Sequence, residues 1–385
     1  MAAALGLDLA GLDKPRQRAP AAKPAHHPTA ESVPYWNRRV FDLDPYIPGE
    51  QPKRPLVKLN TNESPYGPSP RALAAIKASA NDDMRLYPDP TALKLRQAIA
   101  AQFGLAVEQV FAGNGSDEVL AHAFRALLRD DAPALFPDIT YGFYPVYCAL
   151  FDQPFETVPL RSDFTINVRD YDRESGGVVL ANPNAQTGIA LPLDDVKALL
   201  AMHPNRTVIV DEAYVDFGAQ SAVSLLRDHP NLLVVRTFSK SSGLAGLRVG
   251  YALGSPLLIE GLVRVKDSFN SYPLSRAALD GAAASIADNA WMAQTVARIQ
   301  SSRAALVAGL EKIGFEVLPS AANFILARHP QHSAGELAAF LRGRDIIVRH
   351  FPNQERIKDW LRITIGTDGQ CQALLDALAD HLKSA

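Results

Sequence analysis

Three short runs of apolar residues in the middle of the chain constrain its fold most strongly. The runs are Val178-Val179-Leu180, Thr207-Val208-Ile209-Val210 and Leu232-Leu233-Val234-Val235. Continuous apolar runs of this length are typical of strands that are buried on both faces of a parallel sheet. Helix-forming segments such as 193–202 separate them, as crossovers between parallel strands require. The pattern therefore predicts an α/β fold with a large, mostly parallel sheet.

The polar residues that follow these runs are expected to meet at one edge of the sheet. They are, in the order of the runs, Asn182 and Asn184, Asp211 and Tyr214, and Lys240. In open parallel sheets, chemistry gathers outside the carboxyl ends of the strands. An amide, a carboxylate, a phenol and an amine at one edge suit a cofactor with a basic ring nitrogen, a phenolic oxygen and an aldehyde.

Length and composition fit a globular enzyme of two or three domains. The chain has 385 residues, 47% of them hydrophobic and 21% charged, and a formal net charge of -2. This balance gives no electrostatic argument for nucleic acid or an anionic membrane as a partner. The two cysteines, Cys148 and Cys371, lie far apart and have no metal-ligand spacing, so we expect no metal site and a reducing, cytoplasmic location.

Residues 1–34 are rich in Ala and Pro, with basic and His residues interspersed, and are predicted to form a mobile extension. Asp8 and Asp13, together with the lack of a basic leader, argue against a secretory signal or a transit peptide. The pair His26-His27 could bind a metal, but two histidines in such a tail are a weak signal.

A glycine-rich turn joins a short predicted strand to a helix at Gly113-Asn114-Gly115-Ser116. The helix has a clear apolar face from Val119 to Leu128. Free backbone N–H groups and the helix dipole at its start favour a phosphate group. The alternative is a plain helix cap in which Asp117 and Glu118 complement the dipole.

The pattern changes after a long predicted helix, 290–313, which ends at Gly314. Strands and helices then mix, which predicts a smaller α+β domain. The strands are expected at 315–319, 323–328, 346–351 and 360–367, and the helices at 334–341 and 370–382. Alternation of apolar residues from Leu361 to Ile365 turns Arg362 and Thr364 away from the core. The predicted organisation is an extension (1–34), an arm packed on the smaller domain (35–62), a large domain (63–285) and a small domain (286–385).

Eight motifs, spread in order over residues 35–385, resemble those of the fold-type I pyridoxal-phosphate-dependent aminotransferases, and within them the branch that acts on histidinol phosphate. They are N-E-S-P-Y-G-P, F-A-G-N-G-S-D-E, I-T-Y-G-F-Y, N-P-N-A-Q-T-G, V-D-E-A-Y, T-F-S-K-S-S-G-L-A-G-L-R-V-G, A-N-F-I and L-R-I-T-I-G-T. Each motif is weak alone, but together they are specific.

The resemblance implies roles for the residues at the sheet edge. Lys240 would form a Schiff base with pyridoxal phosphate and then transfer protons. Asp211 would pair with the ring nitrogen, and Tyr214 and Asn184 would bind the phenolic oxygen. Tyr141 would stack on the ring. The phosphate would be held by the turn, by nearby hydroxyls and a guanidinium, and by a tyrosine from the second subunit of a homodimer. These residues are Gly115, Ser116, Asp117, Thr237, Ser239, Arg248 and Tyr87.

For the substrate, the resemblance implies that Arg362 binds an anionic group and that Arg349 and Tyr46 bind a phosphate. Two guanidiniums favour a phosphorylated amine over an apolar amino acid. The reaction expected is transamination of histidinol phosphate with 2-oxoglutarate, which yields glutamate. One departure concerns the motif around Asn184, where Ala185 and Gln186 replace the family's Asn and Pro. The contact to the ring oxygen therefore falls to Asn182 or to Asn184.

Three other hypotheses are weighed against this one. An aromatic or broad-specificity aminotransferase would use the same scaffold and offer a substrate carboxylate to Arg362. A decarboxylase of a phosphorylated amino acid, similar to threonine-phosphate decarboxylase, would release carbon dioxide. A non-enzymatic regulator with this fold is disfavoured by the presence of Lys240, Asp211 and Arg248.

Overall fold

The computed structural model describes residues 35–384. The predicted mobile extension and the pair His26-His27 lie outside the described residues. Residues 35–44 belong to a compact unit separate from that of residues 45–384. The first unit contains a short 3₁₀ helix, Arg38–Asp42, whose Arg39 backbone N–H donates to the Asn37 side chain.

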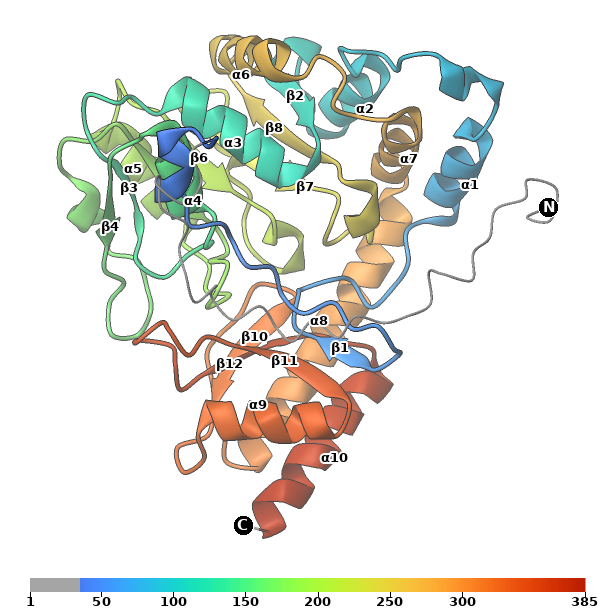
Figure 1. Ribbon diagram of the computed structural model, residues 1–385, viewed down its shortest axis with the longest axis vertical. Coiled ribbons are helices and arrows are strands. Elements are labelled where there is room, and N and C mark those ends of the chain that lie inside the picture. The colour runs from blue at the N-terminus through green and yellow to red at the C-terminus, as the bar shows by residue number, and fades with distance from the viewer. Residues whose placement is uncertain (1–34, 385) are drawn as a thin grey trace. The chain divides into compact units, whose positions relative to one another are not determined.

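The second unit is organised around a seven-stranded sheet in the order β2-β8-β7-β6-β5-β3-β4 (Figure 1). The strands are β2 (Val110–Gly113), β3 (Ala134–Pro137), β4 (Phe155–Val158), β5 (Gly177–Ala181), β6 (Val208–Asp211), β7 (Leu232–Thr237) and β8 (Gly250–Gly254). The three strands predicted from apolar runs are β5, β6 and β7, which pair in parallel. Strand β8 is antiparallel to both of its neighbours, β7 and β2. The predicted mostly parallel sheet is therefore confirmed.

Helices cover both faces of this sheet, which explains why its central strands consist mainly of apolar residues. Along β6, Val208 and Val210 belong to one hydrophobic cluster and Ile209 to another. The first cluster includes α2 (Leu93–Phe103), α5 (Leu193–Met202) and α7 (Arg276–Ile286), on which α1 (Pro70–Ser79) packs. The second includes α3 (Gly115–Leu127), α4 (Tyr144–Phe151) and α6 (Pro256–Phe269). A strand with both faces covered must carry apolar residues at every position.

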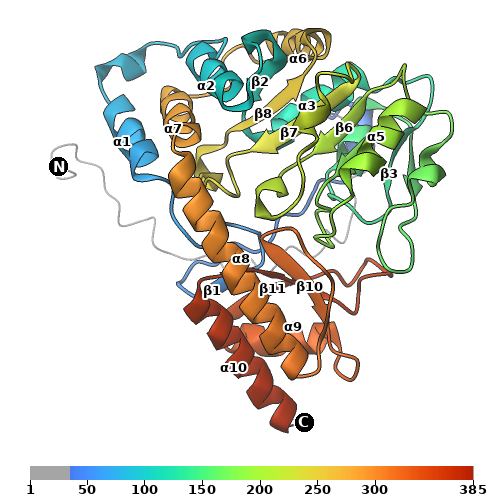
Figure 2. The same ribbon diagram turned by 180° about the vertical axis from the view of Figure 1, so that it is seen from behind.

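A five-stranded sheet with the order β1-β11-β12-β10-β9 forms the smaller α+β part. Its strands are β1 (Val57–Leu59), β9 (Glu316–Val317), β10 (Phe324–Arg328), β11 (Ile346–His350) and β12 (Leu361–Thr364), and its helices α8 (Asn289–Lys312), α9 (Ala334–Gly343) and α10 (Asp368–Ser384). Helix α8 runs from the helices beside the larger sheet to the smaller sheet, where it lies beside α10 (Figure 2). Strand β1 comes from the N-terminal segment and pairs in parallel with β11. The predicted fold class, a large α/β domain with a smaller α+β domain, is confirmed.

Local contacts determine where some elements begin and end. Helix α2 begins at Leu93, after a turn in which the Asp89 carboxylate accepts hydrogen bonds from the backbone N–H groups of Thr91 and Leu93. The strand expected at 315–319 is only two residues long. Thr364 faces away from the core as predicted, yet it is buried, because Asn62 covers it through two hydrogen bonds.

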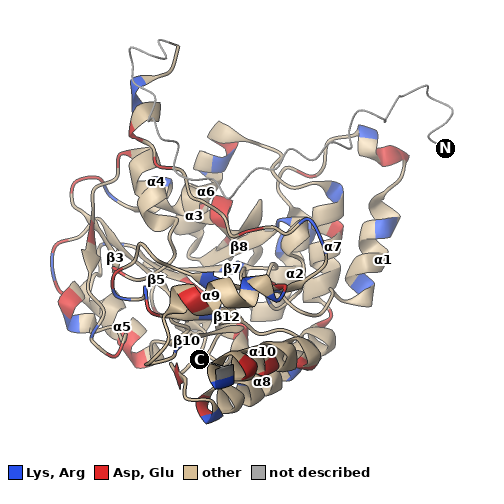
Figure 3. Ribbon diagram, turned by 60° about the horizontal axis from the view of Figure 1, so that its bottom comes forward, with Lys and Arg blue, Asp and Glu red and all other residues tan. Residues whose placement is uncertain are grey.

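Within residues 35–384, no helix is long and apolar enough to cross a membrane. The same residues contain no group of three or more His, Cys, Asp or Glu side chains arranged to hold a metal ion. Basic and acidic residues are both scattered over the exposed surface, and the charged residues of α10 are mostly acidic (Figure 3).

Candidate active site

Lys240 lies just after β7, at the carboxyl end of the parallel strands. Its ammonium donates a 3.3 Å hydrogen bond to the carbonyl oxygen of Thr61 and lies 5.6 Å from the centre of the Tyr214 ring. The side chain is therefore directed toward the loop that precedes α1 and toward the loop after β6. The sequence predicted that the Lys240 amine and the Tyr214 phenol would lie close together at this edge of the sheet, and they do.

A buried ionic network supports the loop that carries Lys240. The neighbouring Ser241 hydroxyl donates to Asp216 at 2.5 Å, and Asp216 in turn pairs with Arg236 of β7. Arg236 also lies 3.6 Å from Glu212, whose carboxylate accepts from Ser221 at 2.7 Å. Burial raises the pKa of Glu212 to about 7. Removal of one partner from a buried ionic network destabilises a protein much more than removal of one partner from an exposed pair. We therefore expect this network to keep the loop in one conformation.

Asp211 ends β6 and presents a buried carboxylate beside Lys240 in the wall of the same cavity. One carboxylate oxygen accepts from the Tyr144 hydroxyl at 3.0 Å, and the other accepts from the backbone N–H of Ala213 at 3.2 Å. Burial raises the pKa of Asp211 to about 6, which these two hydrogen bonds partly oppose. A buried carboxylate with a raised pKa is stabilised by a cationic partner.

The Tyr214 hydroxyl accepts a 3.0 Å hydrogen bond from the side-chain amide of Asn62. Its ring packs edge-on against Phe324 with ring centres 5.0 Å apart. The position of the phenol is thus fixed by one contact from the N-terminal segment and one from the smaller sheet.

The turn between β2 and α3 is built for close approach. Gly115 has a φ of +80°, and a Cβ atom there would lie 2.4 Å from the Arg248 guanidinium. A Cβ atom on Gly250 would lie 2.3 Å from the Ser116 backbone nitrogen. Arg248 donates to the Asp117 carboxylate at 3.0 Å. Backbone N–H groups, a guanidinium and the hydroxyls of Thr237 and Ser239 therefore surround one space, which suits a phosphate.

Tyr141 connects this turn to the rest of the wall, because its hydroxyl donates to Asp117 at 2.7 Å. Burial, reinforced by the charge of Asp117, raises the pKa of Tyr141 far above its ordinary value. The tyrosine therefore stays neutral, and it lines the cavity beside this turn.

These side chains line two adjoining cavities. The smaller cavity has a volume of about 180 Å³. Its wall contains Lys240, Asp211, Tyr214, Tyr141, Ser116, Asp117, Thr237, Ser239 and Arg248. The larger cavity has a volume of about 510 Å³ and shares Lys240, Tyr214 and Tyr141 with the smaller one.

Two arginines on neighbouring strands dominate the larger cavity. Arg349 of β11 and Arg362 of β12 are direct register partners in the antiparallel pair. Arg362 donates to three neutral acceptors, the carbonyl oxygens of Ala185 and Asn60 and the side-chain oxygen of Gln186. Its Nε is buried without a partner. Burial lowers the pKa of Arg362, as expected for a cation in a poorly solvated site.

Tyr46 completes this wall on the side of the N-terminal segment. Its ring lies 4.4 Å from that of Phe143 and 6.4 Å from that of Tyr141. The phenol therefore lies in the same cavity as Arg349 and Arg362.

Three of the residues named as candidates line neither cavity in the described part of the chain. The Asn184 side chain donates to the Ile139 carbonyl and accepts from the backbone of Gln186 and Thr187, so its amide is committed to the turn. In the described residues, Ala185 lines both cavities and Asn184 lines neither. The Asn182 side chain likewise donates to the Leu191 carbonyl oxygen and accepts from the Leu191 backbone N–H. Tyr87 is 79% exposed and also lines neither cavity.

Three functional-site residues were missed from the sequence. Asn62 contacts Tyr214, Tyr144 contacts Asp211, and Ala185 forms the wall where an amide was expected. The available signal for Asn62 was its place in a loop dense in turn-forming residues, since long ordered loops tend to carry function. The signal for Tyr144 was only its place in an aromatic-rich segment.

The fold and the site together define a lysine-centred enzyme whose buried carboxylate, phenol and anion-binding turn suit a phosphorylated cofactor with a basic ring. Residues 54–378 match the aminotransferase class I and II family, and the chain belongs to that family.

The chain is similar in sequence to known proteins of one branch of this family. The chain is 64% identical over 350 residues to histidinol-phosphate aminotransferase 2 of Gluconobacter oxydans, covering 91% of this chain and 98% of that one. It is 62% identical over 351 residues to histidinol-phosphate aminotransferase of Acetobacter pasteurianus, with the same coverage. The crystal structure of histidinol-phosphate aminotransferase from Sinorhizobium meliloti, in complex with pyridoxal-5'-phosphate, superposes with a TM-score of 0.76 at 27% identity. The match covers 85% of this chain and 91% of that one.

Proposed function

We propose that this protein is a pyridoxal-phosphate-dependent aminotransferase that converts histidinol phosphate and 2-oxoglutarate to imidazole acetol phosphate and glutamate, a step of histidine biosynthesis. Relatives named for this activity are about as long as the chain and share 64% and 62% of their aligned residues with it. The smaller cavity supports pyridoxal phosphate as the cofactor, because an amine, a buried carboxylate, a phenol and an anion-binding turn surround it.

The pairing of Arg349 with Arg362 is the observation that carries the substrate assignment. Like charges directly opposite each other on neighbouring strands are destabilising. Both guanidiniums lie near the Phe351 ring, at 5.4 and 5.3 Å, and both line the larger cavity beside Lys240. An anion such as a substrate phosphate or carboxylate would offset this repulsion.

Each residue of the smaller cavity has a role that its surroundings support. Bound pyridoxal phosphate supplies an electron sink for negative charge at the substrate carbon. The Asp211 carboxylate, held by Tyr144 and buried, holds the proton on a ring nitrogen. The Lys240 amine moves a proton at the substrate carbon. Ser116, Thr237, Ser239 and Arg248 would bind the phosphate and Tyr141 would orient the ring, since all five line this cavity.

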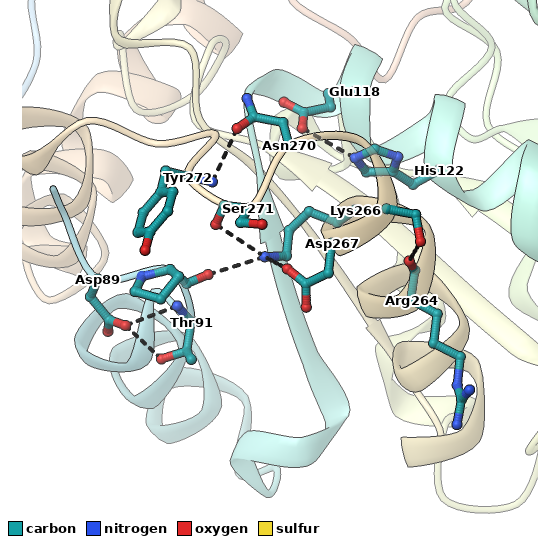
Figure 4. Close-up of polar contacts among 12 residues, drawn as sticks. Asp89, Thr91, Glu118, His122, Arg264, Lys266, Asp267, Asn270, Ser271 and Tyr272 are labelled. Atoms are coloured by element: carbon teal, nitrogen blue, oxygen red, sulfur yellow. Dashed lines mark hydrogen bonds and ion pairs between the residues drawn. The ribbon is translucent and has the colours of Figure 1, made fainter.

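Tyr87 belongs to an exposed face that we assign to a homodimer interface. Its ring stacks on that of Tyr272 at 4.7 Å. The buried ammonium of Lys266 donates to the carbonyl oxygens of Pro90 and Ser271, at 3.2 and 3.4 Å, and so ties the two segments together (Figure 4). Large exposed apolar side chains are concentrated in these segments: Met84, Leu86, Leu93 and Phe269. Such patches mark interaction sites, and Tyr87 would reach the phosphate in the second copy.

Subunit complementation tests the dimer. Tyr87→Ala and Lys240→Ala variants are each expected to be weakly active or inactive, whereas a mixture that exchanges subunits should regain activity, because one site in each mixed dimer keeps both residues. A monomer in sedimentation, or no regain of activity after verified subunit exchange, would contradict this arrangement.

A cytoplasmic location is part of the same proposal, since both cysteines are free and buried.

A coupled glutamate assay with purified protein, pyridoxal phosphate, histidinol phosphate and 2-oxoglutarate tests the reaction. Comparison of kcat/KM for histidinol phosphate and phenylalanine separates the proposal from an aromatic aminotransferase, because that ratio reports differential binding of the transition state. Release of carbon dioxide without an oxo-acid acceptor would instead indicate a decarboxylase.

A further inference from the structure

A chain of three buried side chains runs from the smaller sheet to the smaller cavity. The backbone N–H of Asn62 donates to the Thr364 hydroxyl at 2.9 Å, and that hydroxyl donates to the Asn62 side-chain oxygen at 3.0 Å. The Asn62 amide nitrogen then donates to the Tyr214 hydroxyl at 3.0 Å. Asn62 and Thr364 are 1% and 3% exposed, so water cannot replace these partners.

The direction of this chain follows from the number of protons available. A threonine hydroxyl has one proton, and an asparagine side chain has one acceptor oxygen and one donor NH₂ group. With the amide turned the other way, the Thr364 hydroxyl would receive two donors and its own proton would lose its acceptor. Leaving a buried donor without a partner costs about 1–3 kcal/mol. Asn62 therefore donates to Tyr214, which leaves the Tyr214 proton free.

The backbone of Asn62 is held in an unusual conformation that makes this contact. Its φ is +57°, in the left-handed region that asparagine tolerates better than most residues. The Asn62 carbonyl accepts a 3.0 Å hydrogen bond from the side chain of Asn323, which is fully buried. The amide is thus fixed from two sides, by Asn323 and by Thr364.

We propose that Asn62 is a positioning residue that turns the Tyr214 hydroxyl into a hydrogen-bond donor toward the cofactor's phenolic oxygen. The inference rests on the proposed function, because the cofactor provides the acceptor. The Asn182 and Asn184 amides donate to the carbonyl oxygens of Leu191 and Ile139 instead, and Ala185 lines the cavity in their place. Tyr214 is therefore the donor on this wall, and Asn62 determines which way its proton points.

Asn62→Asp tests the direction with almost no change of shape. A carboxylate only accepts hydrogen bonds, so the Tyr214 proton should turn toward the new carboxylate and away from the cavity. The pH at which the visible absorbance of the bound cofactor changes should rise by about one unit, as expected when a hydrogen bond to the charged form is lost. Tyr214→Phe should give the same shift, and Asn62→Asp should add nothing in the Tyr214→Phe background.

Two outcomes would overturn the inference. An equal additional shift from Asn62→Asp in the Tyr214→Phe background would show that the new charge acts directly, and an unchanged titration would show that Asn62 does not direct the proton. If the variant does not fold, Thr364→Val and Thr364→Ser decide. The valine variant should shift the titration in the same direction and the serine variant should not, whereas identical titrations contradict the inference.

Asn231→Asp is a matched control for a purely structural effect. Asn231 donates to the carbonyl oxygens of Leu200, His203 and Arg206 and lines neither cavity in the described part of the chain. It should lower the melting temperature without moving the titration. A wild-type protein that binds pyridoxal phosphate with no visible absorbance change from Lys240→Ala would reject the cofactor assignment itself, which separates that failure from the failure of the role of Asn62.

Discussion

The two adjoining cavities satisfy their polar groups in different ways. In the smaller cavity most groups already have partners: Asp211 has Tyr144, Asp117 has Arg248 and Tyr141. In the larger cavity, Arg349 and Arg362 lie opposite each other on the neighbouring strands β11 and β12, and Arg362 donates to neutral oxygens. We infer that the first wall is preorganised for a resident group, whereas the second would be completed by an anion that enters and leaves.

This difference separates the consequences of substitution. Changes in the smaller cavity should affect cofactor chemistry, and therefore kcat, for every substrate. Changes in the larger cavity should affect KM, and should do so only for substrates that carry the matching anion. The following variants test that division.

Lys240→Ala is expected to have the largest effect. It removes the amine to which we assign both cofactor binding and proton transfer, so turnover should fall by about 10⁴-fold or more. The visible absorbance of the lysine-bound cofactor should disappear, while pyridoxal phosphate should still bind through the turn at Gly115. Stopped-flow absorbance and equilibrium dialysis measure the two effects. Retained absorbance in the variant would place the reactive amine elsewhere.

Asp211→Asn should retain the cofactor but lower kcat by about 10²- to 10³-fold, as for other buried, preorganised electrostatic groups. The pKa of Asp211 is raised from 3.8 to about 6 in the fold. The folded protein therefore binds this proton more tightly than the unfolded chain does, which stabilises the fold below pH 4. This contribution to the free energy of unfolding is lost as the pH rises through 6, and the pKa difference corresponds to about 3 kcal/mol.

Denaturant unfolding of the cofactor-free proteins between pH 4 and 7 measures this effect. The wild type should lose stability relative to Asp211→Asn across that window, and bound cofactor should remove the loss by pairing with the carboxylate. Comparison with the variant is needed because Glu212, with a pKa raised to about 7, titrates nearby. Parallel stability curves for the two proteins would contradict a raised pKa at Asp211.

Arg349→Ala tests the larger cavity. It should lower kcat/KM for histidinol phosphate by about 10- to 100-fold, mostly through KM, since a hydrogen bond to a charged group contributes about 1.5–3 kcal/mol. The effect on phenylalanine should be small. The cofactor-free protein should be equally or slightly more stable, by less than about 1 kcal/mol, because a like-charged cross-strand pair is removed. Equal losses for both substrates would contradict a phosphate-binding role.

Arg328→Ala is the control for this experiment. Arg328 pairs with Glu316 at 2.7 Å on neighbouring strands of the same sheet and lines neither cavity in the described residues. Its removal should leave both kinetic constants within about twofold of the wild type, as expected for an exposed ion pair.

The sequence was sufficient for the parts of the site that strand pattern determines. Apolar runs predicted β5, β6 and β7. Because functional residues of parallel sheets lie beyond the carboxyl ends of the strands, Asp211 and Lys240 were expected to lie close together. The direction of β8 and the strands β3 and β4 were not predicted, because a short apolar run does not say which neighbour it joins. Strand order is decided by packing across the whole sheet.

Contacts between distant segments were beyond the sequence for the same reason. Asn62 and Thr364 are separated by 302 positions, and Asn62 and Tyr214 by 152. Asn184 illustrates the reverse error: its motif suggested a ligand contact, but its side chain closes its own turn through Gln186 and Thr187. A motif gives residue types, whereas the hydrogen-bond partners depend on the fold around it.

Apart from the control, Arg356→Gln should have the smallest effect, and it tests whether the two cavities are coupled. Arg356 lies in the connection between β11 and β12, the strands that carry Arg349 and Arg362. It donates to the Asp138 carboxylate at 2.7 Å and to the Leu160 and Arg161 carbonyl oxygens at 2.9 and 2.8 Å. Asp138 is three positions before Tyr141, so Arg356 connects the strands that carry the two arginines to the segment that carries this tyrosine.

The partly exposed pair should contribute less than about 1 kcal/mol to stability. Misplacement of the two arginines should nevertheless raise KM for histidinol phosphate about three- to tenfold, because binding is sensitive to small errors in position. Asp138→Asn should produce a similar change, and the double variant should be no worse than either single variant if the ion pair transmits the effect. Additive losses would mean that the two residues act separately, and an unchanged KM would mean that the larger cavity holds its arginines without help from the larger sheet.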